Sequence, residues 1–438
     1  MQLLIQILQL LACLSLLVIV HEFGHFITAK IFGVRVEKFY LFFNPGFSLL
    51  KWKPKNSETE YGIGWLPFGG YVKLAGMIDE SLDTDQMKKP VQDWEFRSKP
   101  AWQRLIIMLA GVVMNFIAAI VIYSMVLFTY GESNVPMREA KLGMDFSEVA
   151  HAQGFKDGDI ILSADGDSLV YFDEESMRKI IGASQVVVLR DGKEHTLTMT
   201  STFMKDMIAS KQGFASYRIP FVVREVINGG PAESAGLQVG DSIVGVNDTV
   251  IITMDDSYAI FQNNKNNVIK LNFYRAGLED SVSLALDSAG RIGVYVKPYF
   301  EVYPTVNYEY GFFESFPAGI EKGVKTFTGY GSDMKMVFSK EGVESLGGFG
   351  TITSLFPGNF SWAAFWYLTA YISVILAFMN VLPIPALDGG HILFLLYEMI
   401  TRKKLSQEFM IRMQKIGLFI LLLLLLYANG MDIFRAFK

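Results

Sequence analysis

Four long apolar stretches, at residues 1–20, 105–130, 363–382 and 416–427, constrain the fold of this 438-residue chain more than any other feature. The first three contain no charged side chain, and about 20 apolar residues in a helix are enough to cross the ~30 Å hydrocarbon core of a bilayer. The fourth is shorter, so we expect it to tilt or to thin the bilayer locally. The composition agrees, because 51% of the residues are hydrophobic and only 19% are charged. The pattern predicts a membrane protein with four transmembrane helices.

The N-terminal stretch has two interpretations, a cleaved secretory signal or a retained helix. It has no basic region at its start and no small-residue cleavage site. It also leads directly into His21, Glu22, Phe23, Gly24 and His25. We therefore expect it to be retained as the first transmembrane helix.

The distribution of Lys and Arg predicts the orientation of the chain. The segments 30–104 and 402–415, which follow the first and the third crossing, are rich in these residues, whereas the stretch 1–20 has none. The positive-inside rule places both segments in the cytoplasm and both termini outside. The long segment from about residue 131 to residue 362 is then extracytoplasmic. The net charge of -5 argues against a nucleic-acid-binding surface, so we expect no nucleic-acid partner.

An internal repeat lies within this outer segment. The stretches 154–166 and 236–248 align without gaps, and both read as a turn, an alternating strand and a second turn. The pattern resembles the Gly-Asp turn and following strand of PDZ domains. The second copy is the better match, because residues 228–235 (Asn-Gly-Gly-Pro-Ala-Glu-Ser-Ala) precede it. A PDZ domain can bind a peptide as an added strand at its edge, but these copies can equally serve as a steric block or spacer.

His21 and His25 are the strongest candidates for a metal site. Four positions apart on a helix, both imidazoles lie on one face and can hold one ion, with Glu22 placed to hold a water beside it. Ionisable groups at the end of an uncharged span are expected to be paired or coordinated. The alternative is a solvated helix end just beyond the membrane.

An open zinc site needs a third protein ligand, and few residues can supply one. The chain has five histidines and one cysteine, Cys13. His151 and His195 belong to the outer segment, across the membrane from the first motif. His391 and carboxylates at membrane depth remain.

Asp388 is the preferred third ligand, and His391 is the second choice. Pro383 and Pro385 break the third helix just before Asp388, and non-helical backbone at this depth is tolerated only within protein or along a wet cavity. The first and third crossings run in the same direction, so Asp388 and His21 fall at the same depth. The alternative for Asp388 is a simple Asp-Gly-Gly turn at the surface.

Taken together, these motifs resemble the site-2 protease family of intramembrane zinc metalloproteases, in its bacterial branch of regulator-of-sigma-E protease type with tandem PDZ domains. The resemblance is carried by HEFGH at 21–25, NVLPIPALDGGH at 380–391 and the two repeats, and it is supported by the segments 62–73 and 96–104. The family's Gly-Phe-Gly-Pro turn reads Phe-Phe-Asn-Pro-Gly at 42–46, and its Gly-Pro before an asparagine reads Gly-Val-Val-Met-Asn at 111–115. These departures put loop geometry and helix packing in doubt and leave the chemistry unaffected.

The resemblance implies His21, His25 and Asp388 as Zn²⁺ ligands and Glu22 as the catalytic base. It further implies that the substrate is held by Asn380, by Gly69, Gly70 and Tyr71 of a membrane-re-entrant hairpin, and near the Pro383 and Pro385 break. Asn380 can instead make a hydrogen bond between helices, and the hairpin segment can instead be a cytoplasmic loop.

The expected fold class is a multi-pass α-helical membrane protein with four transmembrane helices, a membrane-re-entrant β-hairpin and an extracytoplasmic insert of two PDZ-like α+β domains. The N-terminal membrane part is 1–130, with helices at about 3–28 and 104–130 and the hairpin at about 58–76. The PDZ-like domains are 131–216 and 217–300. An amphipathic region at 301–360 is expected to lie on the outer membrane surface. The C-terminal membrane part is 361–438, with helices at about 362–387 and 408–428.

The implied activity is zinc-dependent cleavage of the transmembrane segments of single-span proteins, of the anti-sigma-factor or signal-peptide-remnant type, after another protease has trimmed the ectodomain. The implied location is the bacterial inner membrane, with the metal site toward the cytoplasm, and the lipid bilayer and peptides bound by the PDZ-like domains are further expected partners. A silent scaffold is disfavoured because it needs no base at Glu22, and a metal transporter would need several polar crossings.

Overall fold

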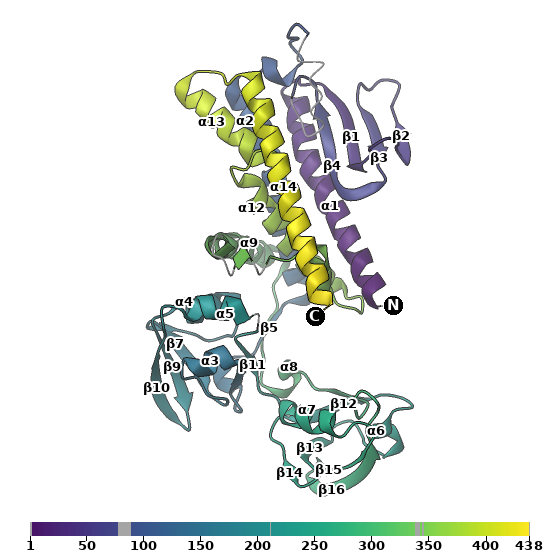
Figure 1. The fold of residues 1–438 in the computed structure, drawn as a ribbon, viewed down its shortest axis with the longest axis vertical. Helices are drawn as coiled ribbons and strands as arrows, with labels where there is room; N and C mark the ends of the chain where they lie inside the picture. Colours follow the sequence, from purple (N-terminus) through teal and green to yellow (C-terminus); the bar gives the residue numbers. More distant parts are fainter. Residues whose placement is uncertain (1, 78–88, 211, 338–341, 344–345, 438) are drawn as a thin grey trace. The chain divides into compact units, whose positions relative to one another are not determined.

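The computed structural model describes residues 2–77, 89–210, 212–337, 342–343 and 346–437, and the chain divides into two units (Figure 1). The membrane unit comprises Met1–Gly131 and Glu309–Lys438, and the inserted unit comprises Glu132–Tyr308. The predicted metal ligands all belong to the membrane unit.

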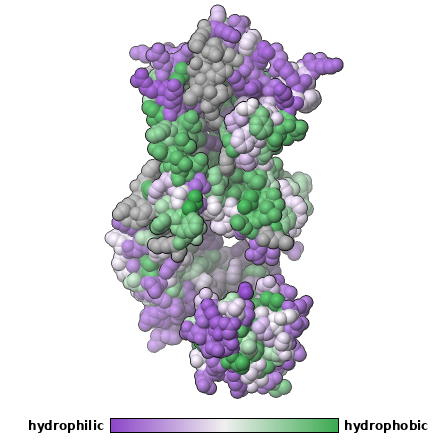
Figure 2. Space-filling model, turned by 45° about the vertical axis from the view of Figure 1, so that its right-hand side comes forward, coloured by the Kyte–Doolittle hydropathy of each residue, from purple (hydrophilic) through white to green (hydrophobic). Residues whose placement is uncertain are grey.

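Four helices of the membrane unit are long and apolar enough to cross a bilayer: α1 (Gln2–Ile31), α2 (Ala101–Tyr130), α12 (Trp362–Val381) and α14 (Gln407–Ala436). Apolar side chains gather over these helices on the face shown in Figure 2, and hydrophilic side chains gather at the end where α1 ends and α2 begins. The described residues therefore contain four candidate membrane-spanning helices, in agreement with the prediction.

Two of these helices differ from the sequence-based bounds by more than three residues. We expected the third to run to about residue 387, but α12 ends at Val381, because Pro383 and Pro385 lack the amide hydrogens that would continue it. We expected the fourth to span about residues 408–428, but α14 runs from Gln407 to Ala436, so it has 30 residues and a length of about 45 Å.

Helix α2 is the centre of the membrane unit. It packs against α1, α12, α9 (Phe312–Val337) and α13 (Asp388–Thr401). Glycines permit the closest approaches: a Cβ atom on Gly24 of α1 would lie 2.4 Å from the carbonyl oxygen of Ala110, and one on Gly319 of α9 would lie 2.1 Å from Ser124 Oγ. The backbones of these helices are consequently in direct contact, which fixes the position of α1 against α2.

A four-stranded sheet packs beside α1 (Figure 1), and its topology corrects one prediction. Its strands are β1 (Val36–Phe43), β2 (Leu50–Trp52), β3 (Glu60–Ile63) and β4 (Leu66–Leu74), in the order β2-β3-β1-β4. The sequence predicted a hairpin over 58–76, but β3 and β4 do not pair with each other. Strand β1 lies between them, parallel to β3 and antiparallel to β4.

Aromatic packing explains why β1 takes the central position. Tyr40 of β1 stands opposite Gly62 of β3 and Tyr71 of β4. A Cβ atom on Gly62 would lie 2.2 Å from the Tyr40 ring, so the glycine makes room for it. On the other side the rings of Tyr40 and Tyr71 stack with centroids 5.3 Å apart. The short 310 helix η2 (Phe96–Ser98) then leads into α2.

The region that was predicted to hold amphipathic helices contains α9 and α11 (Phe349–Leu355). Helix α9 packs on α2 and α12, and on its outer side Phe313 is 84% exposed and Ile320 is 48% exposed. A helix with one face against protein and an apolar face left outside is suited to a membrane surface.

Among its described residues, the inserted unit contains two large hydrophobic cores, built from residues 137–214 and 221–292, and a small cluster of Val135, Ala140 and Tyr303. The region of the first large core comprises η3 (Met137–Glu139), β6 (Met144–Phe146), α3 (Glu148–Ala152), β7 (Ile160–Ala164), β8 (Asp167–Ser168), α4 (Glu174–Gly182), β9 (Gln185–Arg190), β10 (Lys193–Thr198), α5 (Phe203–Ser210) and β11 (Ala215–Tyr217). The region of the second comprises β12 (Phe221–Val226), α6 (Pro231–Ser234), β13 (Ser242–Val246), β14 (Thr249–Val250), α7 (Met254–Asn263), β15 (Val268–Arg275), β16 (Leu278–Ala285) and β17 (Val294–Val296). The first region has the sheets β10-β9-β7-β8 and β11-β6, and the second has the sheet β16-β15-β13-β12-β17 with β14 beside β13.

The aligned repeats make the same buried ion pair. Asp159 receives hydrogen bonds of 2.7 and 2.6 Å from Arg190, and Asp241 receives bonds of 2.8 and 2.7 Å from Arg275. In both copies the arginine also donates to the carbonyl of the glycine that opens the repeat. The aspartate of each Gly-Asp turn therefore ties the turn to the last residue of a strand, β9 in the first copy and β15 in the second.

The two ends of the inserted unit run side by side. Strand β5 (Glu132–Asn134) pairs antiparallel with β18 (Val306–Tyr308), with Ser133 opposite Asn307. Helix α8 (Tyr299–Val302) precedes β18, and Tyr303 donates a hydrogen bond to the carbonyl of Arg218. The unit is thus closed at its base by a pair of short strands.

Candidate metal centre and active site

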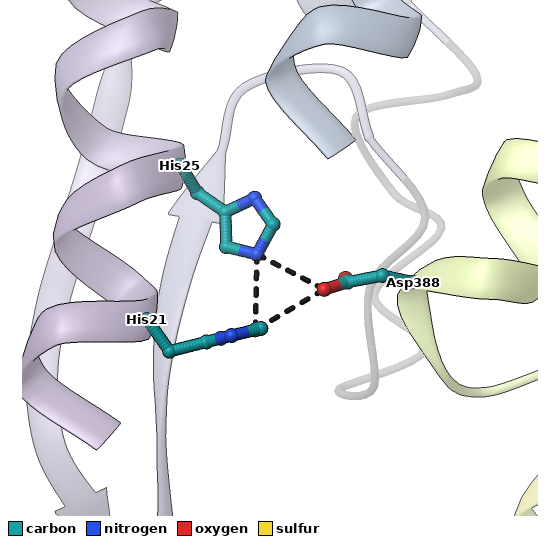
Figure 3. Close-up of side chains that lie close together, drawn as sticks. All are labelled: His21, His25 and Asp388. Atoms are coloured by element: carbon teal, nitrogen blue, oxygen red, sulfur yellow. Dashed lines mark hydrogen bonds and ion pairs between the residues drawn. The ribbon is translucent and has the colours of Figure 1, made fainter. Parts of the chain in front are cut away.

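Helix α1 places His21 and His25 one turn apart on one face. Their Nε2 atoms lie 3.2 Å apart, and the side chains are 13% and 9% exposed. Helical periodicity alone determines this placement, because α1 continues without a break from Gln2 to Ile31. Figure 3 shows the two imidazoles converging on one point beside the helix.

Asp388 reaches the same point from another helix (Figure 3). Its Oδ2 atom lies 3.1 Å from Nε2 of His21 and 3.3 Å from Nε2 of His25. One ligand atom from each of the three residues lies within 4.8 Å of the others. Two imidazole nitrogens and a carboxylate oxygen in this arrangement suit a zinc ion with an open coordination position. The residue set that the sequence predicted is brought together.

The break between α12 and α13 explains how Asp388 is presented. Asp388 is the first residue of α13, directly after the turn that contains Pro383 and Pro385. A Cβ atom on Gly389 would lie 1.9 Å from the carbonyl oxygen of Leu382, and one on Gly390 would lie 2.7 Å from that of Ile384. The two glycines therefore let the chain fold tightly over the start of the helix, and this fold directs Asp388 toward α1.

His391, the second choice as a ligand, is not part of this group. It lies one turn beyond Asp388 on α13 and lines the adjacent cleft. Among the residues that the structure describes, the only group of His, Cys, Asp and Glu side chains that can share an ion is His21, His25 and Asp388.

Helix α2 supplies contacts that sequence reasoning did not assign. Nδ1 of His25 lies 2.8 Å from the carbonyl oxygen of Ile107, and Nδ1 of His21 lies 3.3 Å from the amide of Asn115. Between them, a Cβ atom on Gly111 would lie 2.4 Å from Nε2 of His25. In the sequence Gly111 and Asn115 appear only as the two ends of the Gly-Val-Val-Met-Asn segment, whose second position departs from the family pattern. A glycine and an amide four positions apart in an uncharged span were the available signal.

A cleft of about 760 Å³ opens beside the three ligands. Glu22 lies on its wall next to the histidines, as a base for hydrolysis must. Among the residues predicted to hold substrate, Asn380, Gly70 and Tyr71 line the cleft, whereas Gly69, Pro383 and Pro385 do not. The remaining lining residues include Lys38, Phe43, Asn44, Leu66, Val72, Lys73, Met77, Met108, Leu387 and Gln414.

Strand β4 forms one side of the cleft and lies at the edge of its sheet. It pairs with β1 on one side, and among the described residues no strand pairs with its other side. Gly70, Tyr71 and Val72 of this strand line the cleft, and the hydroxyl of Tyr71 donates to Oδ1 of Asn44 at 2.9 Å. The Asn44 contact joins the strand to the β1–β2 connection, which is the segment that departs from the family pattern.

Comparison with known proteins agrees with this geometry. Residues 9–424 match the model described as peptidase family M50, the family of the site-2 proteases. The chain belongs to peptidase family M50. This M50 protein is 30% identical to the regulator of sigma E protease of Haemophilus influenzae, over 96% of this chain and 97% of that one. It is 28% identical to metalloprotease MmpA of Caulobacter vibrioides (99% and 96%) and 30% identical to protease RseP of Yersinia pestis (98% and 97%). It is a metalloprotease with a zinc cofactor, and its apolar helices make it a membrane protein.

Proposed function

We propose that this M50 protein is an intramembrane endopeptidase in which His21, His25 and Asp388 hold the zinc ion. The observation that supports it is the convergence of three ligand atoms within 4.8 Å from two helices that are far apart in the sequence. A zinc ion in such a site polarises a carbonyl group and lowers the pKa of a bound water molecule to about 7.

Glu22 is the general base in this proposal. Its carboxylate takes a proton from the attacking water and passes it to the leaving amine, which is the usual role of the glutamate between two ligating histidines. Its place on the cleft wall beside His21 and His25 supports this role. The two histidines and Asp388 accept no proton in the reaction and serve to hold the ion.

The substrate we propose is a transmembrane helix of a single-span protein. The peptide bonds of a helix are enclosed by i to i-4 hydrogen bonds, so the segment must unwind before it is cut. Each backbone group freed in lipid costs several kcal/mol unless it finds a partner. Strand β4 is the terminal strand of the described sheet and lines the cleft, which supports pairing of an extended segment along it, and the amide of Asn380, which also lines the cleft, offers further partners.

The depth of the cleft supports cleavage within the membrane. Gly70 of β4 packs against Val18, which belongs to the uncharged part of α1. The sheet therefore extends alongside the apolar part of α1, as expected of a membrane-re-entrant element. By the positive-inside rule the sheet and the metal ligands lie toward the cytoplasm of the inner membrane, and the inserted unit lies outside.

The inserted unit is proposed to be a pair of PDZ-like domains that limits which substrates reach the cleft. Proteins with large intact ectodomains would be excluded, which makes this enzyme the second protease to act, on anti-sigma factors or signal-peptide remnants. The name of the Haemophilus relative refers to sigma E regulation and supports the first class. Strand β17 is an edge strand, so the second domain can also bind a peptide by strand addition.

Co-expression with single-span substrate candidates tests the activity. Wild-type protein is expected to shorten a substrate with a trimmed ectodomain, and Glu22→Gln is expected to abolish the shortened product while zinc stays bound. Glu408→Gln, on the exposed start of α14 and outside the cleft, is the matched control and should cleave normally. Normal cleavage by Glu22→Gln would exclude Glu22 as the base. Equal cleavage of intact and trimmed substrates would exclude the size filter.

A further inference from the structure

Asn115 is a buried amide of α2 that lies beside the proposed ligand His21. It is 1% exposed, and its Nδ2 atom lies 3.3 Å from Nδ1 of His21. Its Oδ1 atom is buried and has no hydrogen-bond partner among the described residues. Its backbone is fixed, because Ser373 Oγ of α12 donates to the Asn115 carbonyl at 2.7 Å.

Metal binding places a requirement on the partner of each histidine. A neutral imidazole has one N–H, so a histidine that binds an ion through Nε2 has its proton on Nδ1 and needs an acceptor there. For His25 the acceptor is the carbonyl oxygen of Ile107, at 2.8 Å from Nδ1. Because a carbonyl can only accept, it permits only the tautomer of His25 that leaves Nε2 free for an ion.

His21 has an amide in the equivalent place, and an amide can either donate or accept. With Nδ2 toward His21, Nδ1 of the imidazole is the acceptor and the proton is on Nε2, which can donate it to Oδ2 of Asp388 at 3.1 Å. With the amide turned by half a rotation, Oδ1 accepts from Nδ1–H, and Nε2 is free for an ion. The two ends of an amide have nearly the same shape, so both arrangements fit the same buried space.

We propose that Asn115 is a positioning residue that selects the metal-binding tautomer of His21 by directing Oδ1 of its amide to Nδ1–H. The inference rests on the ligand set proposed above. Loss of a hydrogen-bond partner behind a ligating histidine typically lowers metal affinity by about 10- to 100-fold. Replacement of the amide by an apolar side chain of similar shape should have an effect of this size.

Zinc affinity of the purified full-length protein, measured by competition with a chromophoric chelator after metal removal, tests the inference without an activity assay. Asn115→Leu keeps the shape and removes the acceptor, and it should bind zinc about 10- to 100-fold more weakly than wild type. Asn115→Asp can only accept, so it should bind zinc at least as tightly as wild type. Ser124→Ala removes another buried polar group of α2, far from the ligands, and should leave zinc affinity unchanged.

The pair of Asn115 variants separates positioning from packing. Equal zinc affinity in wild type and Asn115→Leu would overturn the inference, and so would a tenfold loss in Asn115→Asp. If Asn115→Leu does not fold, Asn115→Ala, which also removes the acceptor, takes its place and should show the same loss of zinc affinity. Wild-type protein that binds no zinc would refute both the ligand set and this inference, whereas wild-type binding matched by Asn115→Leu refutes the inference alone.

Discussion

Gly111 of α2 packs directly against the two histidines of the proposed metal site. Its replacement by alanine is therefore a direct test of the geometry. The new Cβ atom would lie 2.4 Å from Nε2 of His25, 2.7 Å from Cε1 of His21 and 2.8 Å from its Nε2. Ordinary van der Waals contact begins near 3.4 Å, so the imidazoles must retreat by about 1 Å.

The expected effect on function is large and the effect on stability is small. A displacement of about 1 Å in a catalytic group can reduce the rate by about 100-fold. Crowding in a packed interior costs about 1–3 kcal/mol, but alanine in a helix is favoured over glycine by about 1 kcal/mol. We therefore expect Gly111→Ala to lose about 100-fold in cleavage rate and about 10- to 100-fold in zinc affinity, with no more than about 2 kcal/mol of lost stability.

Three measurements on detergent-purified protein test this expectation: chelator competition for zinc affinity, cleavage of a trimmed single-span substrate, and thermal unfolding of the metal-free protein. Gly430→Ala in α14 is the control, because a Cβ atom there would meet no neighbouring atom of the described residues within 4 Å, and this variant should behave as wild type. Wild-type zinc affinity and cleavage in Gly111→Ala would show that α2 does not confine the two imidazoles, and the proposed site would be wrong.

Three further predictions concern other parts of the chain. Arg275→Ala should destabilise the second core of the inserted unit at pH 7, because Asp241 is left as a buried charge without its partner. Burial raises the pKa of Asp241, but hydrogen bonds from Arg275 and from the Gln238 amide outweigh this effect and hold the pKa below its usual value. The ion pair therefore stabilises the folded state at pH values above the unfolded pKa of the aspartate. The difference in stability between wild type and Arg275→Ala, measured by hydrogen exchange, should shrink as the pH falls below about 4. Burial raises the pKa of Asp145 to about 6, against the opposing effect of Arg218, so the folded state holds this proton more tightly than the unfolded state. When the pH is lowered from 7 to 4, the free energy of hydrogen-exchange protection around β6 should rise by about 1 kcal/mol in wild type relative to Asp145→Asn. A rise in protection when the pH is raised would contradict this prediction. Gly417→Ala would place a Cβ atom 1.8 Å from the carbonyl oxygen of Pro385, so α14 should be displaced from the turn that precedes Asp388 and the cleavage rate should fall by about tenfold or more; an unchanged rate, compared with Gly430→Ala, would show that this contact does not affect the site.

The parts of the site that sequence reasoning identified follow from local rules. The spacing of His21 and His25 determines their shared face as soon as the segment is helical, and the prolines before Asp388 mark irregular backbone at membrane depth. The contacts of Ile107, Gly111 and Asn115 with the histidines depend on how two helices cross. Neither composition nor periodicity gives that crossing, so these residues were not assigned.

The same distinction explains the errors in the fold. The extended character of 58–76 was predicted, but pairing was assumed to be local, whereas β1 from residues 36–43 lies between β3 and β4. The end of α12 at Val381 was misplaced because the apolar pattern was followed past the prolines. The C-terminal end of α14 was placed at about residue 428 instead of Ala436, because Asn429 and Asp432 interrupt the apolar pattern although they continue the helix.

The pairing of β5 with β18 has a consequence for how such a chain can arise. Helix α2 ends at Tyr130, two residues before β5, and α9 begins at Phe312, shortly after β18. Because the incoming and outgoing strands are neighbours, with Glu132 opposite Tyr308, everything between them is topologically a loop that has been enlarged. Such a loop can be acquired, lost or exchanged between ancestors as a module, and a tight turn in its place would still connect the same two helices.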